Sequence, residues 1–209
     1  EWTRIQKAAG TIGLIPEDLD LRQLMIDLMT EQVAGFYNPA TKRLYLIASS
    51  DKSSEDPMAD AQRRALKMMG TSEEEIYMAH ELIHALEDQH FDLLMLDLEQ
   101  IDDDRITATK SLIEGTATVA MFDFLAGKMN MDPKTLRAQN PMGDGNSMGG
   151  GKAMERAPEW IKQSLVYPYV GGMKFVSALL DKGGWDLVNE VYSDPPSSSE
   201  QILHPVGQC

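Results

Sequence analysis

Apolar residues recur at the spacing of a helix in the first part of the chain. Between residues 14 and 33 they gather on one face, which holds Leu21, Leu24, Met25 and Leu28. This spacing predicts a helix over 14–33 that ends at Gly35. Residues 35–48 combine an Asn-Pro turn signal with the strand-like run Leu-Tyr-Leu-Ile at 44–47, so they predict a β-hairpin, and a polar loop follows at 49–57.

Two long helices are predicted in the middle of the chain. The first has a strong start, because Ser72 can cap it and Glu75, three residues on, completes a capping box. Its pattern continues to Phe91. The second helix is expected over 103–129, where three consecutive aspartates at 102–104 suit the positive N-terminal end of a helix.

The last third of the chain begins with a glycine-rich stretch at 140–152, which predicts a mobile loop. Helical pattern returns over 158–166, 168–180 and 184–192, and a short helical turn is expected at 199–203. Taken together, the elements predict an α+β protein that is mainly helical, with a small antiparallel sheet.

Composition narrows the class of protein. With 209 residues, the chain is long enough for one well-packed domain, and we expect residues 1–209 to form a single one. No apolar run of about 18 residues appears, so no transmembrane segment is predicted. The net charge of −14 argues against a nucleic-acid partner, because phosphate binding needs a basic face. The single cysteine, Cys209, excludes an internal disulfide, and a start at Glu1 is expected of a processed product or a piece of a longer chain.

The strongest chemical signal is the sequence His-Glu-Leu-Ile-His at residues 80–84. On a helix, His80 and His84 lie on the same face one turn apart, so both imidazoles can converge on one cation. Glu81 lies beside them and is the candidate general base for a water at the metal. Two imidazoles suit zinc, so we expect Zn²⁺ as the cofactor.

A catalytic zinc site needs a third protein ligand, and two residues are candidates. His90, six residues after His84, has the spacing of the longer metzincin motif, but Glu87 stands where that motif has a helix-ending glycine. If the helix continues, His90 points about 240° away from His84 around the axis. Glu114 follows His84 by 30 residues, enough for the chain to turn and return antiparallel, and Gly115 suggests close approach of another element.

The His-Glu-Leu-Ile-His sequence, followed by Glu-Gly-Thr-Ala at 114–117, resembles the gluzincin metallopeptidases. The resemblance implies that His80, His84 and Glu114 bind zinc and that Glu81 is the base. Residues 168–172 are similar to the Pro-Tyr-x-x-Gly segment of the same enzymes, which implies that Tyr169 hydrogen-bonds the oxyanion.

Two other comparisons with that family refine the resemblance. The chain lacks the Gly-x-Met-Glu-Asn motif of aminopeptidases and is much shorter than those enzymes, which favours an endopeptidase. The Glu-Gln-Ile-Leu-His-Pro segment at 200–205 resembles the ending of uncharacterised bacterial gluzincin-like domains. His204, in that segment, is a candidate second oxyanion donor or a packing residue.

The expectation from the sequence is therefore a mainly helical, zincin-like α+β domain that hydrolyses peptide bonds in a peptide or protein substrate. An extended peptide is expected to pair with the edge of the strand at 44–48. The resemblance favours an extracytoplasmic or secreted bacterial location. The alternatives are a metzincin-like peptidase that uses His90, a different hydrolase on the same metal, and a zinc-binding regulatory or binding module without turnover.

Overall fold

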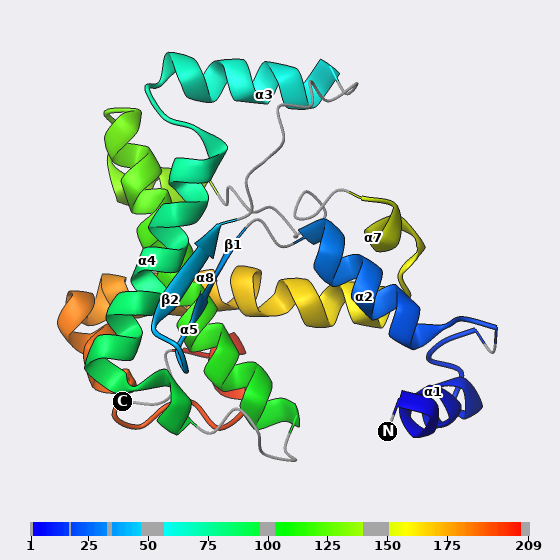
Figure 1. The fold of residues 1–209 in the computed structure, drawn as a ribbon. Helices are drawn as coiled ribbons and strands as arrows, with labels where there is room; N and C mark the ends of the chain where they lie inside the picture. The colour runs from blue at the N-terminus through cyan, green and yellow to red at the C-terminus, as the bar shows by residue number, and fades with distance from the viewer. Residues whose placement is uncertain are drawn as a thin grey trace. The chain divides into compact units, whose positions relative to one another are not determined.

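The computed structural model describes residues 2–16, 18–32, 35–46, 57–96, 103–139 and 151–205. These residues are mainly helical and include a two-stranded antiparallel sheet, which confirms the predicted α+β class (Figure 1). The described elements, in chain order, are α1 (Trp2–Thr11), α2 (Leu21–Gln32), β1 (Gly35–Asn38), β2 (Arg43–Leu46), α3 (Pro57–Met68), α4 (Glu73–Phe91), the 3-10 helix η1 (Leu93–Leu96), α5 (Asp103–Lys128), α6 (Pro133–Ala138), α7 (Lys152–Arg156), α8 (Glu159–Val191) and α9 (Ser199–Leu203).

The chain divides into two compact units. The first combines Glu1–Val33 with Met142–Tyr167, and the second combines Ala34–Pro141 with Pro168–Cys209. Every predicted site residue belongs to the second unit. The single domain expected over residues 1–209 stays a prediction.

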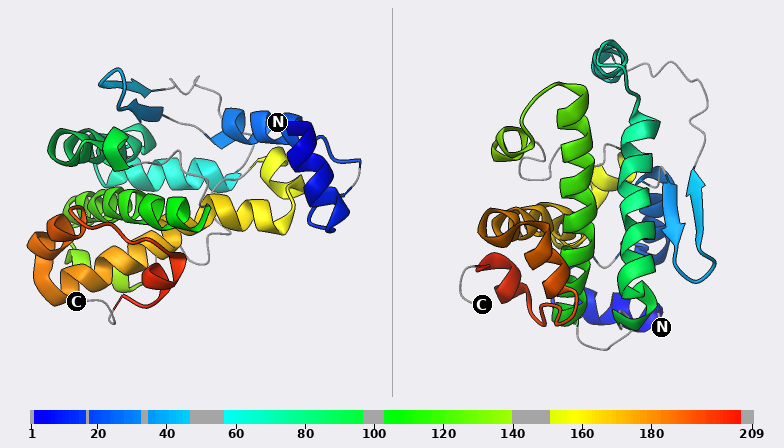
Figure 2. Two further views of the ribbon diagram at one scale, coloured as in Figure 1. Left: turned by 90° about the horizontal axis from the view of Figure 1, so that it is seen from below. Right: turned by 90° about the vertical axis from the view of Figure 1, so that its left-hand side faces the viewer.

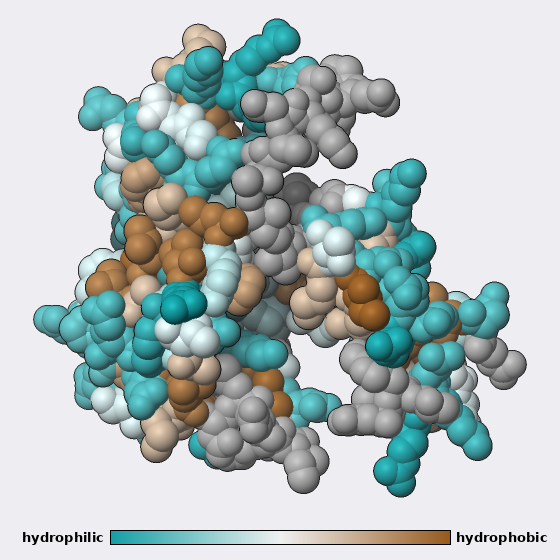
Figure 3. Space-filling view, in the orientation of Figure 1, coloured by the Kyte–Doolittle hydropathy of each residue, from teal (hydrophilic) through white to brown (hydrophobic). Residues whose placement is uncertain are grey.

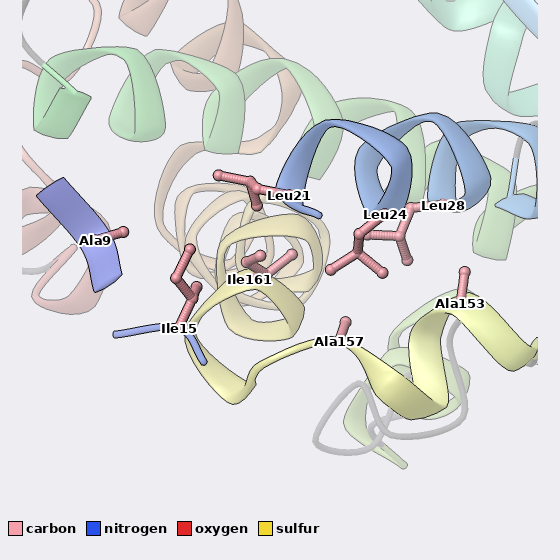
Figure 4. Packing of buried hydrophobic residues seen from close by; sticks show 8 residues of the cluster. All are labelled: Ala9, Ile15, Leu21, Leu24, Leu28, Ala153, Ala157 and Ile161. Atoms are coloured by element: carbon pink, nitrogen blue, oxygen red, sulfur yellow. The ribbon is translucent and has the colours of Figure 1, made fainter. Parts of the chain in front are cut away.

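The first unit is built around one cluster of buried apolar side chains (Figure 4). The apolar face predicted for the first helix supplies much of it, and the full set is Ala9, Ile15, Leu21, Leu24, Leu28, Ala153, Ala157 and Ile161. The helix itself begins at Leu21 rather than at residue 14. Gly13 has a φ of 77°, outside the helical range, and Pro16 cannot donate a helical hydrogen bond, so the chain turns before α2 begins.

In the second unit, α4 and α5 lie side by side and run in opposite directions, with the β1–β2 hairpin against α4 (Figure 2). The Lys128 ammonium at the end of α5 lies 3.5 Å from the Glu75 carboxylate at the start of α4, as an antiparallel pair requires. Both long helices are confirmed within a residue or two of their predicted bounds. The antiparallel arrangement brings the middle of α5 opposite the middle of α4.

A buried carboxylate of α4, Asp88, attaches the hairpin to this helix. Asp88 accepts a hydrogen bond from the Tyr37 hydroxyl at 2.6 Å. It also forms an ion pair with the Lys42 ammonium at 2.7 Å. Burial opposes ionisation of Asp88, but these two donors and the Leu93 N–H outweigh it and lower the pKa of Asp88. The same contact raises the pKa of Tyr37 to about 12. These bonds hold β1 in place beside the histidine face of α4.

The hairpin follows the predicted pairing, with Gly35 opposite Leu46 and Tyr37 opposite Leu44. Residues 47–56, which include the predicted end of the second strand and most of the predicted polar loop, lie outside the described residues. The glycine-rich stretch at 140–150 also lies outside them.

The C-terminal third differs from its prediction at Pro168. The helices expected over 158–166 and 168–180 run on through Pro168 within α8, whereas Gly184, with a φ of 67° and a ψ of −163°, interrupts the helix at the residue where the third helix, over 184–192, was predicted to begin. A proline removes one helical hydrogen bond but does not always end a helix. The short turn predicted at 199–203 is confirmed as α9, whereas α1, α3, α6 and α7 were not predicted.

Apolar side chains gather at the surface over α4 and the hairpin (Figure 3). On α4 they are Met78, Leu82 and Leu86, spaced four residues apart. At 100° per residue, this stripe lies roughly 120–160° around the axis from His80 and His84. The stripe is therefore a separate surface from the histidine face.

The helices α5 and α8 cross at a pair of glycines. A side-chain carbon added at Gly115 would lie 2.3 Å from the backbone carbonyl carbon of Gly172. One added at Gly172 would lie 2.1 Å from the Ser111 carbonyl oxygen. Because only hydrogen fits at either position, the crossing fixes the distance between the helix that carries Glu114 and the helix that carries Tyr169.

We expect Gly115→Ala to lower the free energy of unfolding by about 1–3 kcal/mol or more, because the added methyl group pushes α5 and α8 apart. Urea denaturation measures the change. Gly127→Ala is the matched control on the same helix, since nothing lies within 4 Å of a side-chain carbon there, and it should be neutral or stabilising. Equal stability of the two variants would contradict the close crossing.

Candidate metal site

The helix α4 that carries both histidines has a well-defined start. The Glu75 N–H donates to the Ser72 hydroxyl at 3.3 Å, which confirms Ser72 as the N-cap. The Glu75 carboxylate accepts a hydrogen bond from the Thr71 hydroxyl at 2.9 Å. Three acidic residues in the first turn face the positive end of the helix dipole. The cap fixes where the helix begins and therefore which face His80 and His84 share.

The structure brings His80, His84 and Glu114 together as a group that can hold a metal ion. The Nε2 atoms of His80 and His84 lie 3.1 Å apart, and the Glu114 carboxylate oxygen Oε2 lies 3.1 Å from the first and 3.5 Å from the second. Their side chains are 10%, 12% and 24% exposed, respectively. His80 and His84, on successive turns of α4, and Glu114, on α5, thus direct three ligand atoms at one point.

These separations fit a small cation. A tetrahedral ion with ligands at about 2.0–2.1 Å sets its ligand atoms about 3.3–3.4 Å apart, close to the three observed distances. The donor set of two imidazole nitrogens and one carboxylate oxygen suits zinc and other divalent transition metals. With three protein ligands, a tetrahedral ion keeps one position for water or substrate.

The close contact between His84 and Glu114 also shifts the pKa values of both side chains. Burial lowers the pKa of His84, but hydrogen bonds to Glu114 and Glu87 outweigh it and raise the pKa to about 10. Burial raises the pKa of Glu114, but hydrogen bonds from His80 and His84 outweigh it and lower the pKa to about 2. A positive charge is therefore favoured between these side chains, and a bound cation can take the place of the proton.

Glu81 lies at the edge of the group, half-buried, beside the hairpin. Its Oε2 atom accepts a hydrogen bond from the Tyr37 backbone N–H at 2.7 Å. The strand that reaches Glu81 is therefore β1, and the pairing of a peptide with the edge of the strand at 44–48 stays a prediction. The bond holds the carboxylate in one orientation next to the two histidines.

Tyr169 enters the site from α8. Its ring lies 6.0 Å from the His80 ring, centroid to centroid, at an interplanar angle of 28°. Burial, followed by the charges of Glu114 and Glu81, raises the pKa of the Tyr169 phenol, which therefore keeps its proton and can donate a hydrogen bond. The structure thus brings Tyr169 to the group, and its predicted hydrogen bond to the oxyanion stays a prediction.

Two further histidines were candidates. Helix α4 continues through His90 to Phe91, and the His90 side chain is exposed and lies against the Phe91 ring. Within the described part of the chain, the metal-binding group includes Glu114 and not His90. His204 ends α9, where its exposed imidazole lies 3.4 Å from the Glu200 carboxylate. Its role as an oxyanion donor stays a prediction.

Two residues that the sequence analysis did not assign to the site also reach it. Glu87 contacts His84, and Tyr192 contacts Glu87. The spacing of three residues from His84 to Glu87 places both on one helix face, a signal that could have indicated Glu87. Tyr192 lies 105 residues away in sequence, and no local pattern links it to α4.

The comparisons with known proteins give no match: neither a protein-family model, nor a curated protein, nor a solved structure matches the chain. Among the described residues, no helix is long and apolar enough to cross a membrane. The fold and the site thus define a mainly helical α+β protein with a three-residue group that can bind a metal ion.

Proposed function

We propose that this protein is a gluzincin-like zinc peptidase that hydrolyses internal peptide bonds of a peptide or protein substrate. The observation that carries the proposal is the convergence of His80, His84 and Glu114 on one point, with Glu81 beside them. The order of these residues along the chain resembles that of the gluzincins. A site for binding alone needs no acid–base residue next to the ion, whereas hydrolysis does.

The ligand atoms of the proposed ion are Nε2 of His80, Nε2 of His84 and Oε2 of Glu114. Zinc bound there would polarise the scissile carbonyl and supply water with a pKa near 7. The carboxylate of Glu81 then takes the proton of the attacking water and passes it to the leaving amine. Because Oε2 accepts the Tyr37 N–H, we assign the proton to Oε1.

Tyr169 completes the proposed mechanism. Its phenol keeps its proton at neutral pH and donates a hydrogen bond to the carbonyl oxygen as negative charge develops. In the free protein, the charge of the Glu114 carboxylate is one cause of the raised pKa of this phenol.

The test is hydrolysis of unfolded protein substrates and of a mixed peptide library by the full chain loaded with Zn²⁺. Mass spectrometry of the products identifies the cleaved bonds. The proposal predicts cleavage at internal bonds, loss of cleavage after metal removal with a chelator, and recovery when Zn²⁺ is added back. A protein that binds zinc but cleaves no peptide would favour a regulatory or binding module, and cleavage that persists without metal would exclude the proposed site.

A further inference from the structure

The Glu87 carboxylate lies directly behind one of the proposed ligands. Glu87 is 3% exposed and follows His84 by three residues, so it lies on the same face of α4. Its Oε2 atom is 2.8 Å from Nδ1 of His84, the ring nitrogen on the opposite side from the one that faces Glu114. The two nitrogens of this imidazole therefore have different partners.

This contact determines the tautomer of His84. When a metal ion takes the place of one proton of His84, the proton that stays lies on Nδ1, because the ionised Glu87 carboxylate only accepts hydrogen bonds. The lone pair then lies on Nε2, the atom that faces His80 and Glu114. A hydrogen bond of this kind orients a ligating histidine and makes it a stronger donor to a metal.

Glu87 is itself held from the other side by Tyr192. The Tyr192 hydroxyl donates to Oε1 of Glu87 at 2.5 Å, and Tyr192 is 4% exposed. Its ring stacks on Phe91, with the centroids 4.2 Å apart and the planes at 10°. Both carboxylate oxygens thus have a partner, and Glu87 cannot rotate without breaking one of these bonds.

We propose that Glu87 and Tyr192 are positioning residues for the metal site, which hold His84 with Nε2 directed at the ion. The inference rests on the proposed binding of zinc by His80, His84 and Glu114, but it does not depend on peptide hydrolysis. The two residues that hold His84 come from different parts of the chain. Glu87 lies on α4 itself, and Tyr192 directly follows α8. It assigns no contact with substrate to either residue.

The test compares the zinc affinity of four single variants with that of the wild type. A competing chromophoric chelator gives the dissociation constant for Zn²⁺, and the visible spectrum of Co²⁺-loaded protein reports the surroundings of the ion. We expect Glu87→Gln to weaken Zn²⁺ binding by about 10–100-fold and Tyr192→Phe by about 10-fold, with an altered Co²⁺ spectrum in both. Glu190→Gln and Tyr45→Phe, on exposed side chains of the same unit, are the matched controls and should leave both readouts unchanged.

A double variant separates positioning from a general loss of packing. If Tyr192 acts through Glu87, the combined loss of affinity in Glu87→Gln/Tyr192→Phe is smaller than the product of the two single losses. Tyr192→Phe keeps the ring that stacks on Phe91, so it serves as the test even where Glu87→Gln does not fold.

The outcomes distinguish this inference from the proposed function. Wild-type affinity and an unchanged Co²⁺ spectrum in folded Glu87→Gln would overturn the positioning role and leave the peptidase proposal intact. Weakened binding in a protein whose wild type cleaves no peptide would support the positioning role and overturn the peptidase proposal. A wild type that binds no zinc would overturn both.

Discussion

Glu81→Gln is expected to abolish most of the peptide hydrolysis while it leaves zinc affinity unchanged. Glutamine has nearly the same size, and its carbonyl oxygen can still accept the Tyr37 N–H that Glu81 accepts at 2.7 Å. It cannot take a proton from water, and loss of a general base lowers turnover by about 10²–10⁴-fold. The measurement is kcat on a peptide identified in the cleavage screen, beside the zinc dissociation constant of the same preparation.

The control for Glu81→Gln is Glu190→Gln, the same change of one charge at an exposed position of α8. It should keep wild-type turnover, because Glu190 has no part in the site. Turnover in Glu81→Gln within about threefold of wild type would contradict the assignment of Glu81 as the base, since even a modest acid–base contribution exceeds that. Loss of zinc together with turnover would instead mean that Glu81 supports the metal.

Removal of one of the proposed metal ligands should lower zinc affinity about as strongly as Glu81→Gln lowers turnover. We expect His84→Ala and Glu114→Ala each to weaken zinc binding by more than about 100-fold. Loss of a residue that only hydrogen-bonds a metal ligand already lowers metal affinity by about 10–100-fold, and loss of the ligand itself should lower it further. Glu114 has a further effect, since its negative charge is one cause of the raised pKa of His84. Equilibrium competition for Zn²⁺ measures the affinities, and circular dichroism establishes that each variant is folded.

The comparison that decides the third ligand uses His90→Ala and His204→Ala as controls. Both side chains are exposed, and the metal-binding group of the described residues includes neither, so both variants should bind zinc as the wild type does. If His90→Ala loses zinc and Glu114→Ala keeps it, the metzincin-like alternative replaces the gluzincin-like site.

The parts of the site that the sequence predicted depend on short-range rules. His80 and His84 share a face because they are four residues apart, and Ser72 starts the helix because its hydroxyl caps it. Glu114 could be predicted because Gly115 indicates a close contact, and the structure supplies that contact at Gly172. The bounds of α4, α5 and α9 were predicted for the same reason, since caps and periodic apolar faces are local signals.

The parts that the sequence did not predict depend on contacts between distant residues. Tyr192 reaches Glu87 across 105 residues, and Tyr37 reaches Asp88 across 51. Such pairs depend on how α8 and the hairpin pack, which no local pattern encodes. Pro168 gave a misleading signal, because α8 continues through it.

The most direct test of the central claim, that His80, His84 and Glu114 hold one metal ion, is X-ray absorption at the zinc edge of the Zn²⁺-loaded wild type. We expect one ion per chain, with nitrogen and oxygen ligands at about 2.0–2.1 Å and the outer scattering of two imidazoles. A protein that takes up no zinc, or an ion with the scattering of only one imidazole, would contradict it.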